Sequence, residues 1–315
     1  QRQMCIRDRA GDPALWTTPP FEPTVRDGKL YARGAADMKG SVAAAAVAFA
    51  RLVQEKPNHP GTLAFLITSD EEGDGYEGTK RLVQKLKDEG VTIDACIVGE
   101  PSCSRFFGDT IKNGRRGSLN GKVTIRGKAG HVAYPHLARN PIHEAAPFFA
   151  ELAVKQWDQG NDYFGPTTFQ ISNIQAGVGA VNVVPGELTA LFNIRFNTEW
   201  TAERLIKTIE DLAAKYTLDA CFEWKRSAEP FVTNPGSMTQ KLTQAIADVT
   251  GVRPELSTGG GTSDARFISS ISRETVEFGP INATIHSVNE CAGIDELEAL
   301  AEIYYRTAKA YLENF

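Results

Sequence analysis

Acidic residues follow directly after an apolar run that has the length of a buried strand. Residues 62–67 read Thr-Leu-Ala-Phe-Leu-Ile, and residues 69–72 then place Asp70, Glu71 and Glu72 in a row behind a serine. Such a run predicts a buried strand, and carboxylates at its tip are costly unless cations lie beside them. Gly73 and Gly75 give the following turn its backbone freedom. We therefore expect a strand whose carboxyl end carries a charged site.

The same pattern recurs elsewhere in the chain. Strand-like segments at residues 30–34, 94–99 and 274–278 lead to Asp37, Glu100 and, through a longer loop, His286. In an open α/β sheet, ligands bind outside the carboxyl ends of the strands. We therefore expect acids and a histidine from several strand ends to converge on one shared metal site.

Length and charge narrow the class of protein. A chain of 315 residues is long enough for two domains. A net charge of -5 and a pI near 5.7 give no electrostatic basis for binding nucleic acid or an anionic membrane. No apolar run reaches membrane-spanning length. The five cysteines are scattered without a C-x-x-C pair, which favours a reduced, cytoplasmic compartment over disulfides or a thiolate zinc site.

The order of predicted elements indicates one domain inserted into another. Strand and helix patterns alternate through residues 62–100, as in a parallel α/β layer, and the α/β character returns after about residue 230. Between them lies a compact α+β unit. We therefore expect a first domain at 1–116 and 230–315 and a second at 117–229. The expected helices are 40–52, 141–154, 202–215, 238–250 and 295–312, and the expected strands of the inserted unit are 119–127, 187–197 and 220–224.

Each candidate residue also has an ordinary structural interpretation. Asp37 could simply cap the helix that follows it, and three acids in a row are usually a solvated face. Glu100 precedes a proline in a common type of turn, and an isolated histidine such as His286 is more often structural than a ligand. The company of the other acidic sites favours metal binding, because a carboxylate can bridge two cations.

Other candidates could hold the substrate. The segment Gly259 to Asp264 could cradle an anion through its backbone amides, although it lacks the spacing of a nucleotide-binding loop. Arg115 and Arg116 could clamp a carboxylate or be ordinary surface charge. His131 and His136 lie in a loop bounded by glycine and proline, and either could be a plain surface histidine.

Several motifs together resemble one known family, the two-zinc aminoacylase/carboxypeptidase family of metallopeptidases. The resemblance covers nearly everything from Gly11 onward. It rests on these segments: Gly34-Ala35-Ala36-Asp37-Met38-Lys39-Gly40, Ser69-Asp70-Glu71-Glu72, Gly99-Glu100-Pro101, Gly130-His131 with Pro135-His136, and Gly259-Gly260-Gly261-Thr262-Ser263-Asp264. It implies a zinc-peptidase-like catalytic domain with a mostly parallel central sheet, interrupted by an inserted α+β lid or dimerisation domain.

The resemblance also implies a division of roles. Glu71 would be the general base, and His131 would polarise the scissile carbonyl from the partner subunit of a homodimer. Two zinc ions per subunit would be bound, one replaceable by Co²⁺, and a small-molecule substrate would be held by its carboxylates and amide. The implied metal ligands are Asp37 as the bridge, Glu100 for one zinc, and Glu72 with His286 for the other; the implied substrate contacts are Arg115, Asn182, Gly261 and Thr262.

Within this family, three tracts favour a member that hydrolyses N-succinyl-diaminopimelate: Lys112 to Leu119, His131 to Pro141, and Asn282 to Cys291. In that reaction, zinc would polarise the amide carbonyl and lower the pKa of a shared water, while the base takes the proton and passes it to the leaving amine. Deacetylation of N-acetylornithine and dipeptide hydrolysis are alternatives within the family. A catalytically silent dimerisation or binding module is an alternative from another class.

The chain departs from the family pattern at two places. Family members carry a His-x-Asp motif before the features seen here at Gly11-Asp12 and Trp16 to Phe21, whereas this chain reads Met4-Cys5-Ile6 there and has no histidine before His59. The first nine residues also lack strand or helix periodicity, and we interpret them as a foreign leader on a fragment whose opening strands are missing. The first zinc site is accordingly expected to be incomplete. The second departure is Val181-Asn182, where similar members carry paired asparagines.

Overall fold

A computed structural model describes residues 10–68, 71 and 78–313, which form two compact units. Unit 1 contains the described residues up to Gly114, together with Val232–Thr258 and the chain from Ser263 onward. Unit 2 contains Arg115–Phe231 and Gly259–Thr262. Each unit is described by itself below.

A four-stranded mixed sheet lies at the centre of unit 1, in the order β13-β4-β14-β3. Its neighbours β13 and β4 are parallel, as are β14 and β3, whereas β14 and β4 are antiparallel. Two of its three pairings are therefore parallel, in agreement with the α/β class expected from the sequence. Its strands are β3 (Cys96–Val98), β4 (Thr110–Lys112), β13 (Glu255–Ser257) and β14 (Thr275–Glu277).

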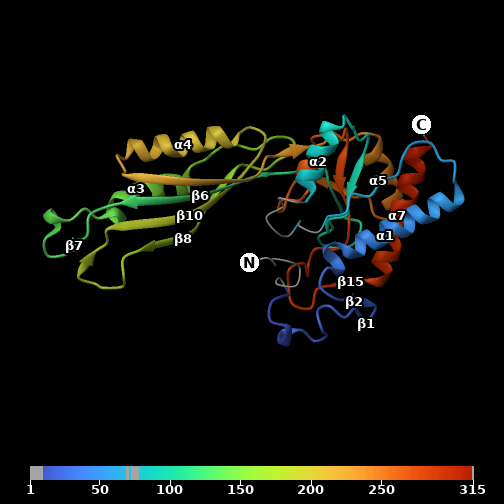
Figure 1. The fold of residues 1–315 in the computed structure, drawn as a ribbon, viewed down its shortest axis with the longest axis horizontal. Helices are drawn as coiled ribbons and strands as arrows, with labels where there is room; N and C mark the ends of the chain where they lie inside the picture. Colours follow the sequence, from blue (N-terminus) through green and yellow to red (C-terminus); the bar gives the residue numbers. More distant parts are fainter. Residues whose placement is uncertain (1–9, 69–70, 72–77, 314–315) are drawn as a thin grey trace. The chain divides into compact units, whose positions relative to one another are not determined.

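Three long helices accompany this sheet, and α1 runs beside α7 (Figure 1). Helix α1 is built largely from alanine, the strongest helix former, and its small side chains allow close packing. Leu52 of α1, Ile246 of α5 and Leu300 of α7 are almost completely buried in one apolar cluster with Val276 and Phe278. The bounds of the helices are α1 (Gly40–Glu55), α5 (Ser237–Thr250) and α7 (Ile294–Leu312).

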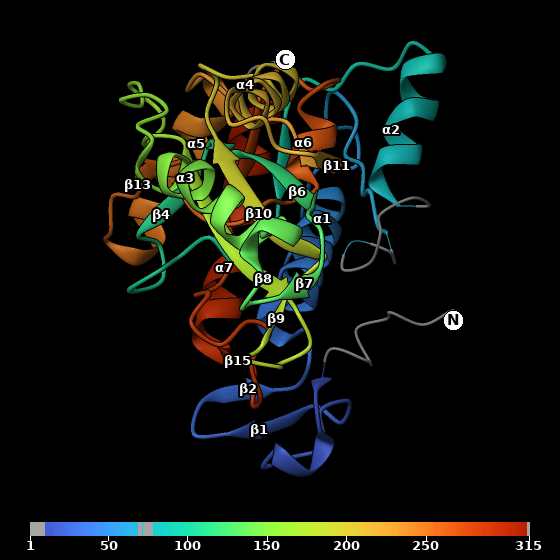
Figure 2. The same cartoon turned by 90° about the vertical axis from the view of Figure 1, so that its left-hand side faces the viewer.

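A separate three-stranded sheet, β1-β2-β15, combines two strands from before α1 with one strand from just before α7 (Figure 2). Its strands are β1 (Thr24–Arg26), β2 (Lys29–Tyr31) and β15 (Cys291–Gly293), and both pairings are antiparallel. The expectation that Asp37 follows a strand of the parallel sheet is therefore wrong. The sequence of residues 30–34 indicated a strand, but a local pattern does not identify the sheet to which a strand belongs.

The strand expected at residues 62–67 is also absent from the structure. This segment has no regular secondary structure, and Phe65, Leu66 and Ile67 are 46%, 40% and 67% exposed. An apolar run becomes a buried strand only if a neighbouring strand pairs with its backbone. Among the described residues, β3 is the edge strand of the central sheet and pairs only with β14. The tip of the segment at residues 69–70 lies outside the described residues.

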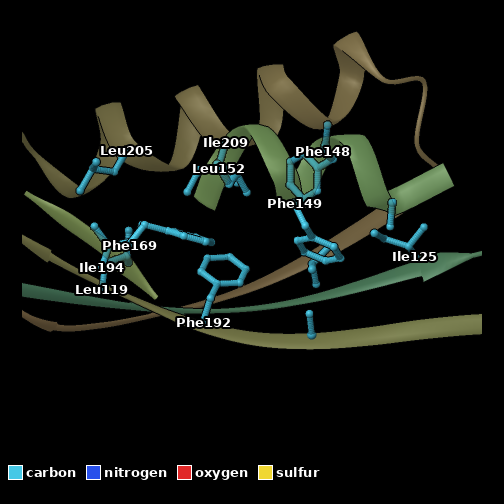
Figure 3. Packing of buried hydrophobic residues seen from close by; sticks show 14 of the residues in the cluster. Leu119, Ile125, Phe148, Phe149, Leu152, Phe169, Phe192, Ile194, Leu205 and Ile209 are labelled. Carbon is cyan, nitrogen blue, oxygen red and sulfur yellow. The ribbon is translucent and has the colours of Figure 1, made fainter. Parts of the chain in front are cut away.

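Unit 2 is a four-stranded antiparallel sheet in the order β11-β6-β10-β8, with helices α3 and α4 against one face (Figure 3). Phe148 and Leu152 from α3 and Ile209 from α4 pack onto Phe192 and other apolar side chains of the sheet. The elements are β6 (Gly117–Arg126), β8 (Thr168–Ala176), β10 (Glu187–Phe196), β11 (Ala220–Ala228), α3 (Pro141–Val154) and α4 (Ala202–Lys215).

Local signals account for where the two helices of unit 2 begin. The Asn140 side chain accepts a hydrogen bond from the N–H of Ile142, and Pro141 occupies the first helical position of α3. The Thr201 hydroxyl accepts one from the N–H of Arg204 at the start of α4. Both helices match the bounds expected from the sequence.

The remaining elements are short. They are α2 (Thr79–Asp88), α6 (Ala265–Ile268), β5 (Gly114–Arg115), β7 (Gly130–His131), β9 (Val183–Val184), β12 (Phe231–Val232), the 3-10 helices Pro13–Leu15 and Pro135–Leu137, and a π-helical turn at Ala35–Lys39. No helix in the described part of the chain is both long enough and apolar enough to cross a membrane.

Candidate functional site

Asp37 lies in the turn that joins β2 to α1. Its φ of -120° and ψ of 92° are not helical, and the next residue, Met38, is not helical either. Helix α1 begins three residues later at Gly40, and its N-cap position is Lys39, whose side chain makes no capping hydrogen bond. Asp37 therefore does not cap α1, and its ordinary structural interpretation is not supported. Its side chain is 13% exposed.

His286 meets Asp37 although 249 residues separate them. The Nε2 atom of His286 lies 3.0 Å from Oδ2 of Asp37. His286 has a φ of 56°, a conformation that side chains other than glycine rarely adopt, and its side chain is 53% exposed. The strained loop after β14 thus presents the imidazole of His286 to the carboxylate of Asp37.

Glu100 follows β3 and is brought towards the same turn by Gly99. A Cβ atom at Gly99 would lie 2.9 Å from Cε of Met38, the residue next to Asp37, and 2.6 Å from Cβ of Ser41. Only glycine permits this approach of the β3 end to the Asp37 turn. The partly buried Glu100 is therefore presented from a strand end that touches the residue after Asp37.

The donor chemistry of the Asp37 and His286 pair fits a zinc ion. Zinc binds imidazole nitrogen and carboxylate oxygen at about 2.0–2.2 Å, and two ligands at tetrahedral angles are then roughly 3.4 Å apart. The observed separation of 3.0 Å is close to that value. A small adjustment of either side chain would let both atoms bind one ion.

The described residues do not complete a metal site by themselves. Within 10–68, 71 and 78–313, no group of three or more histidine, cysteine, aspartate and glutamate side chains could hold a metal ion. Glu71 is described and partly buried in a turn, but the proposed ligand Glu72 lies outside the described residues. The ligand set Asp37, Glu72 and His286 therefore stays a prediction.

Among the described residues, the cysteine in the central sheet, Cys96 of β3, is held as a neutral thiol. Burial, with a smaller contribution from the charge of Glu277, raises the pKa of the Cys96 thiol to about 12. A thiol held in its neutral form is a poor metal ligand, because the thiolate is the form that binds. The four cysteines of the described residues, Cys96, Cys103, Cys221 and Cys291, are all free.

In unit 2 the structure brings His131 and Asn182 together. Strand β7 pairs with β9 so that His131 lies opposite Val183, and the N–H of Val132 donates to the Asn182 carbonyl over 3.1 Å. His131 is exposed, and its Nδ1 atom accepts the N–H of Ala133 over 3.1 Å. This bond fixes the orientation of the ring and leaves Nε2 pointing away from its own backbone.

Arg115 contacts the glycine-rich segment. Its Nη1 atom donates to the carbonyl of Gly259 over 3.1 Å, and the side chain is almost completely buried. A Cβ atom at Gly260, which has a φ of 104°, would lie 2.6 Å from that Nη1 atom. Two of the sequence motifs, the arginine and the segment that carries Gly261 and Thr262, therefore form one cluster.

Sequence reasoning missed two residues that hold the Asp37 turn. The carboxylate of Glu290 is completely buried and accepts the N–H of Asp37, and Arg33 forms a buried ion pair with it over 2.8 Å. In the sequence, Glu290 stands out only as part of the tract Asn282 to Cys291 that carries the resemblance. The available signal was an acid directly before one strand and an arginine shortly after another, but only strand pairing shows that they meet.

The comparisons with known proteins all indicate the same family. Residues 8–310 match the sequence profile of peptidase family M20/M25/M40. A protein of Thiobacillus denitrificans named succinyl-diaminopimelate desuccinylase is 54% identical over 94% of this chain and 76% of its own length. A protein of the same name from Nitrosomonas eutropha is 53% identical over 96% of this chain and 80% of its own.

Solved structures show the same fold. An M20 family metallo-carboxypeptidase from Sulfolobus solfataricus matches with a TM-score of 0.80 at 17% identity, over 96% of this chain and 82% of its own. An aminopeptidase from Bacillus cereus matches with a TM-score of 0.74 at 23% identity, over 92% of this chain and 76% of its own. With a profile that covers nearly the whole sequence, these findings establish that the chain belongs to peptidase family M20/M25/M40.

Proposed function

We propose that this chain hydrolyses the succinyl amide of N-succinyl-diaminopimelate, releasing succinate and diaminopimelate. The observation that carries the proposal is its identity of 52–54% to three proteins named succinyl-diaminopimelate desuccinylase, over 94–96% of the chain. A metal-dependent hydrolase is consistent with membership of the M20 family. The reaction belongs to diaminopimelate and lysine biosynthesis.

The proposed metal centre has two zinc sites, one of them able to take Co²⁺, and the site of Glu100 has fewer ligands in this chain because no histidine precedes His59. Asp37 would bridge them, Glu100 would bind one, and Glu72 with His286 would bind the other. The 3.0 Å contact between the Asp37 carboxylate and the His286 imidazole supports this assignment. When bound, the metal would supply a Lewis acid for the amide carbonyl and lower the pKa of a water molecule.

Glu71 is the proposed general base. It lies in a turn beyond residues 62–67 and is partly buried. A carboxylate there would accept a proton from the attacking water and return it to the amine nitrogen as the amide bond breaks. The adjacent Glu72 side chain would hold metal, so the two acids would have different tasks.

Arg115 and the segment with Gly261 and Thr262 are the proposed carboxylate contacts, together with Asn182. A succinyl amide ends in a carboxylate, and diaminopimelate carries two more. The hydrogen bond from Arg115 to Gly259 fixes the guanidinium before substrate arrives, which reduces the ordering cost of binding. A buried arginine would recognise such a carboxylate more strongly than an acetyl methyl group.

We also propose a homodimer formed through unit 2, in which His131 serves the partner's site. Strand β8 is an edge strand of the unit 2 sheet, and its neighbourhood exposes apolar side chains. Ile174, Val178, Val181 and Val183 are 52%, 87%, 96% and 43% exposed. An apolar edge strand is a ready surface for pairing with another chain.

The free cysteines of the described residues suit a reducing, cytoplasmic compartment.

A substrate panel tests the proposed function. The zinc-loaded protein is assayed with N-succinyl-diaminopimelate, N-acetylornithine and a dipeptide, and release of free amine is measured. We expect kcat/KM to be highest for the succinyl substrate by at least about tenfold, because an acetyl group would leave a buried donor unpaired at a cost of about 1–3 kcal/mol. Equal constants for the first two substrates would favour the deacetylase alternative. No turnover with any substrate at full zinc occupancy would favour the silent module.

A matched substitution locates the specificity. Arg115→Ala should narrow the preference for the succinyl substrate while leaving zinc content unchanged. Arg105→Ala is the control, because its guanidinium lies beside the Phe106 ring in a loop of unit 1 and has no proposed contact with substrate. An unchanged preference in the Arg115 variant would place the succinyl carboxylate elsewhere.

A further inference from the structure

The carboxylate of Glu290 lies within a ring of donors from the Asp37 turn. Glu290 is 0% exposed. Its Oε1 atom accepts the N–H groups of Ala36 and Asp37 over 3.0 and 2.9 Å, and its Oε2 atom accepts the N–H of Gly34 and Nη1 of Arg33 over 3.0 and 2.8 Å. Four donors therefore converge on one buried carboxylate.

Strand pairing brings this carboxylate to the turn. Cys291 of β15 lies opposite Tyr31 of β2, and the pairing extends one residue further, where the N–H of Ala32 donates to the Glu290 carbonyl over 3.2 Å. The chain then bends at Gly34, whose φ of 86° is left-handed. This bend points the next N–H groups back at Glu290, as in the backbone concavities that bind anions.

Arg33 connects the same carboxylate to the loop of His286. Its Nη2 atom donates to the carbonyl of Ser287, the residue after His286, over 3.2 Å. The guanidinium lies over the Trp16 ring at 5.2 Å and is almost completely buried. One carboxylate and one guanidinium therefore hold both loops whose side chains meet at the 3.0 Å contact between Asp37 and His286.

The charge of Glu290 is essential to this arrangement. A buried carboxylate is tolerated only with full compensation, and here every described contact of the side chain is a donor aimed at an acceptor. A glutamine at this position would replace one oxygen with an NH₂ group, which would face N–H groups of the turn or the guanidinium. The NH₂ group would then face at least one other hydrogen-bond donor with no acceptor between them, and the turn would have to move.

We propose that Glu290 and Arg33 are positioning residues of the metal site, setting the separation and orientation of Asp37 and His286. This inference rests on the metal site proposed above. Glu290 fixes the backbone of Asp37, and Arg33 fixes the backbone beside His286. Partners of metal ligands that orient them typically change metal affinity about 10- to 100-fold when removed.

Glu274 offers a matched control in the same unit. It is 7% exposed, and its carboxylate accepts the N–H groups of Gly236, Met238 and Thr239 at the start of α5 over 2.7–3.0 Å. It therefore has the same chemistry and a similar burial, but it serves a helix and not the Asp37 turn. Loss of stability alone would affect both variants.

The experiment compares Glu290→Gln with Glu274→Gln under conditions where circular dichroism shows both to be folded. Zinc affinity is measured by competition with a chromophoric chelator, and the visible spectrum of the Co²⁺ protein reports ligand geometry. We expect Glu290→Gln to weaken zinc binding about 10- to 100-fold and to change the Co²⁺ spectrum, and Glu274→Gln to do neither. Arg33→Lys keeps the charge but loses the second nitrogen that donates to the Ser287 carbonyl. It should therefore also weaken zinc binding.

A measurement without metal separates the inference from the proposed function. Amide hydrogen exchange of the metal-free protein should show residues 34–37 protected in the parent and exposed in Glu290→Gln. A parent that binds no zinc would overturn the proposed metal site, and the exchange result would still decide whether Glu290 holds the Asp37 turn. Unprotected amides in the parent, or equal zinc affinity and Co²⁺ spectra in the parent and Glu290→Gln, would overturn the inference.

Discussion

Gly99→Ala is the substitution whose effect the structure determines most directly. Gly99 follows β3 and allows the strand end that carries Glu100 to approach the start of α1. A Cβ atom there would lie 2.6 Å from Cβ of Ser41 and 2.9 Å from Cε of Met38. Carbon atoms prefer separations of about 3.5–4.0 Å, so the new methyl group would lie about 1 Å too close to both.

The two contacts differ in how easily they yield. Met38 Cε is the end of a flexible side chain and can rotate away. Ser41 Cβ is fixed to the backbone of α1 and is 1% exposed as a residue, so the helix start or the strand end must shift. Forcing an extra methyl group into a packed site typically costs about 1–3 kcal/mol, and we expect a loss of that size in the free energy of unfolding.

Urea denaturation followed by circular dichroism measures the loss, with Gly165→Ala as the control. Gly165 has no positive φ, and a Cβ atom there would meet nothing within 4 Å, so that change should stay within about 0.5 kcal/mol. The double variant Gly99→Ala with Ser41→Gly removes the Ser41 Cβ atom that the new methyl group would contact. Its loss of stability should therefore be smaller than the sum of the two single losses by about 1 kcal/mol or more. A Gly99→Ala protein as stable as the parent, or no coupling with Ser41→Gly, would refute the reasoning.

Three further predictions concern the acids and the histidine. In the zinc-loaded enzyme, Glu71→Gln should leave zinc content intact and remove most turnover, whereas Glu72→Gln should lose metal; identical behaviour in metal analysis and assays would contradict the division of roles. Mixing Glu71→Gln with His131→Ala subunits should restore activity, because one site of each heterodimer then has both residues; no recovery after confirmed subunit exchange would place His131 outside the partner's site. Burial opposes the charge of Asp109, but N–H groups of Arg105 and Ser104 lower its pKa to about 2, below the ordinary 3.8. The Asp109 carboxylate should therefore contribute about 2 kcal/mol to the free energy of unfolding above about pH 4, and this contribution should be lost as the pH falls towards 2. When the free energy of unfolding is measured against pH in acid, its decrease should be smaller in Asp109→Asn than in the parent.

Local signals explain which elements could be predicted from the sequence. Helices α3 and α4 matched their expected bounds because Asn140 and Thr201 cap them and a proline opens the first. Strands β6 and β10 were expected because apolar and polar residues alternate where one face packs on these helices. Each of these signals lies within a few residues of the element that it defines.

The incorrect expectations concern pairing partners. Residues 62–67 have the composition of a buried strand, yet they form no strand, and Ile67 is 67% exposed. The strand before Asp37 was correctly expected but belongs to an antiparallel sheet with β15, about 260 positions away in the chain. Composition determines how readily a segment pairs, but the partner is decided by the rest of the fold.

The roles of Glu290 and Arg33 could not be predicted from the sequence for the same reason, because they depend on which strands pair. This dependence also links metal binding to folding. Their contact spans 257 residues and depends on the register of β2 with β15. Successive side chains of a strand point to opposite faces, so a slip of one residue would turn Glu290 away from the Asp37 turn. The turn would then lose three backbone hydrogen bonds, and the contact between Asp37 and His286 would lose its support on one side. Because β15 contributes only three residues, Cys291–Gly293, few ladder bonds hold that register. It follows that substitutions weakening this small sheet should reduce metal affinity before they unfold the central sheet of unit 1.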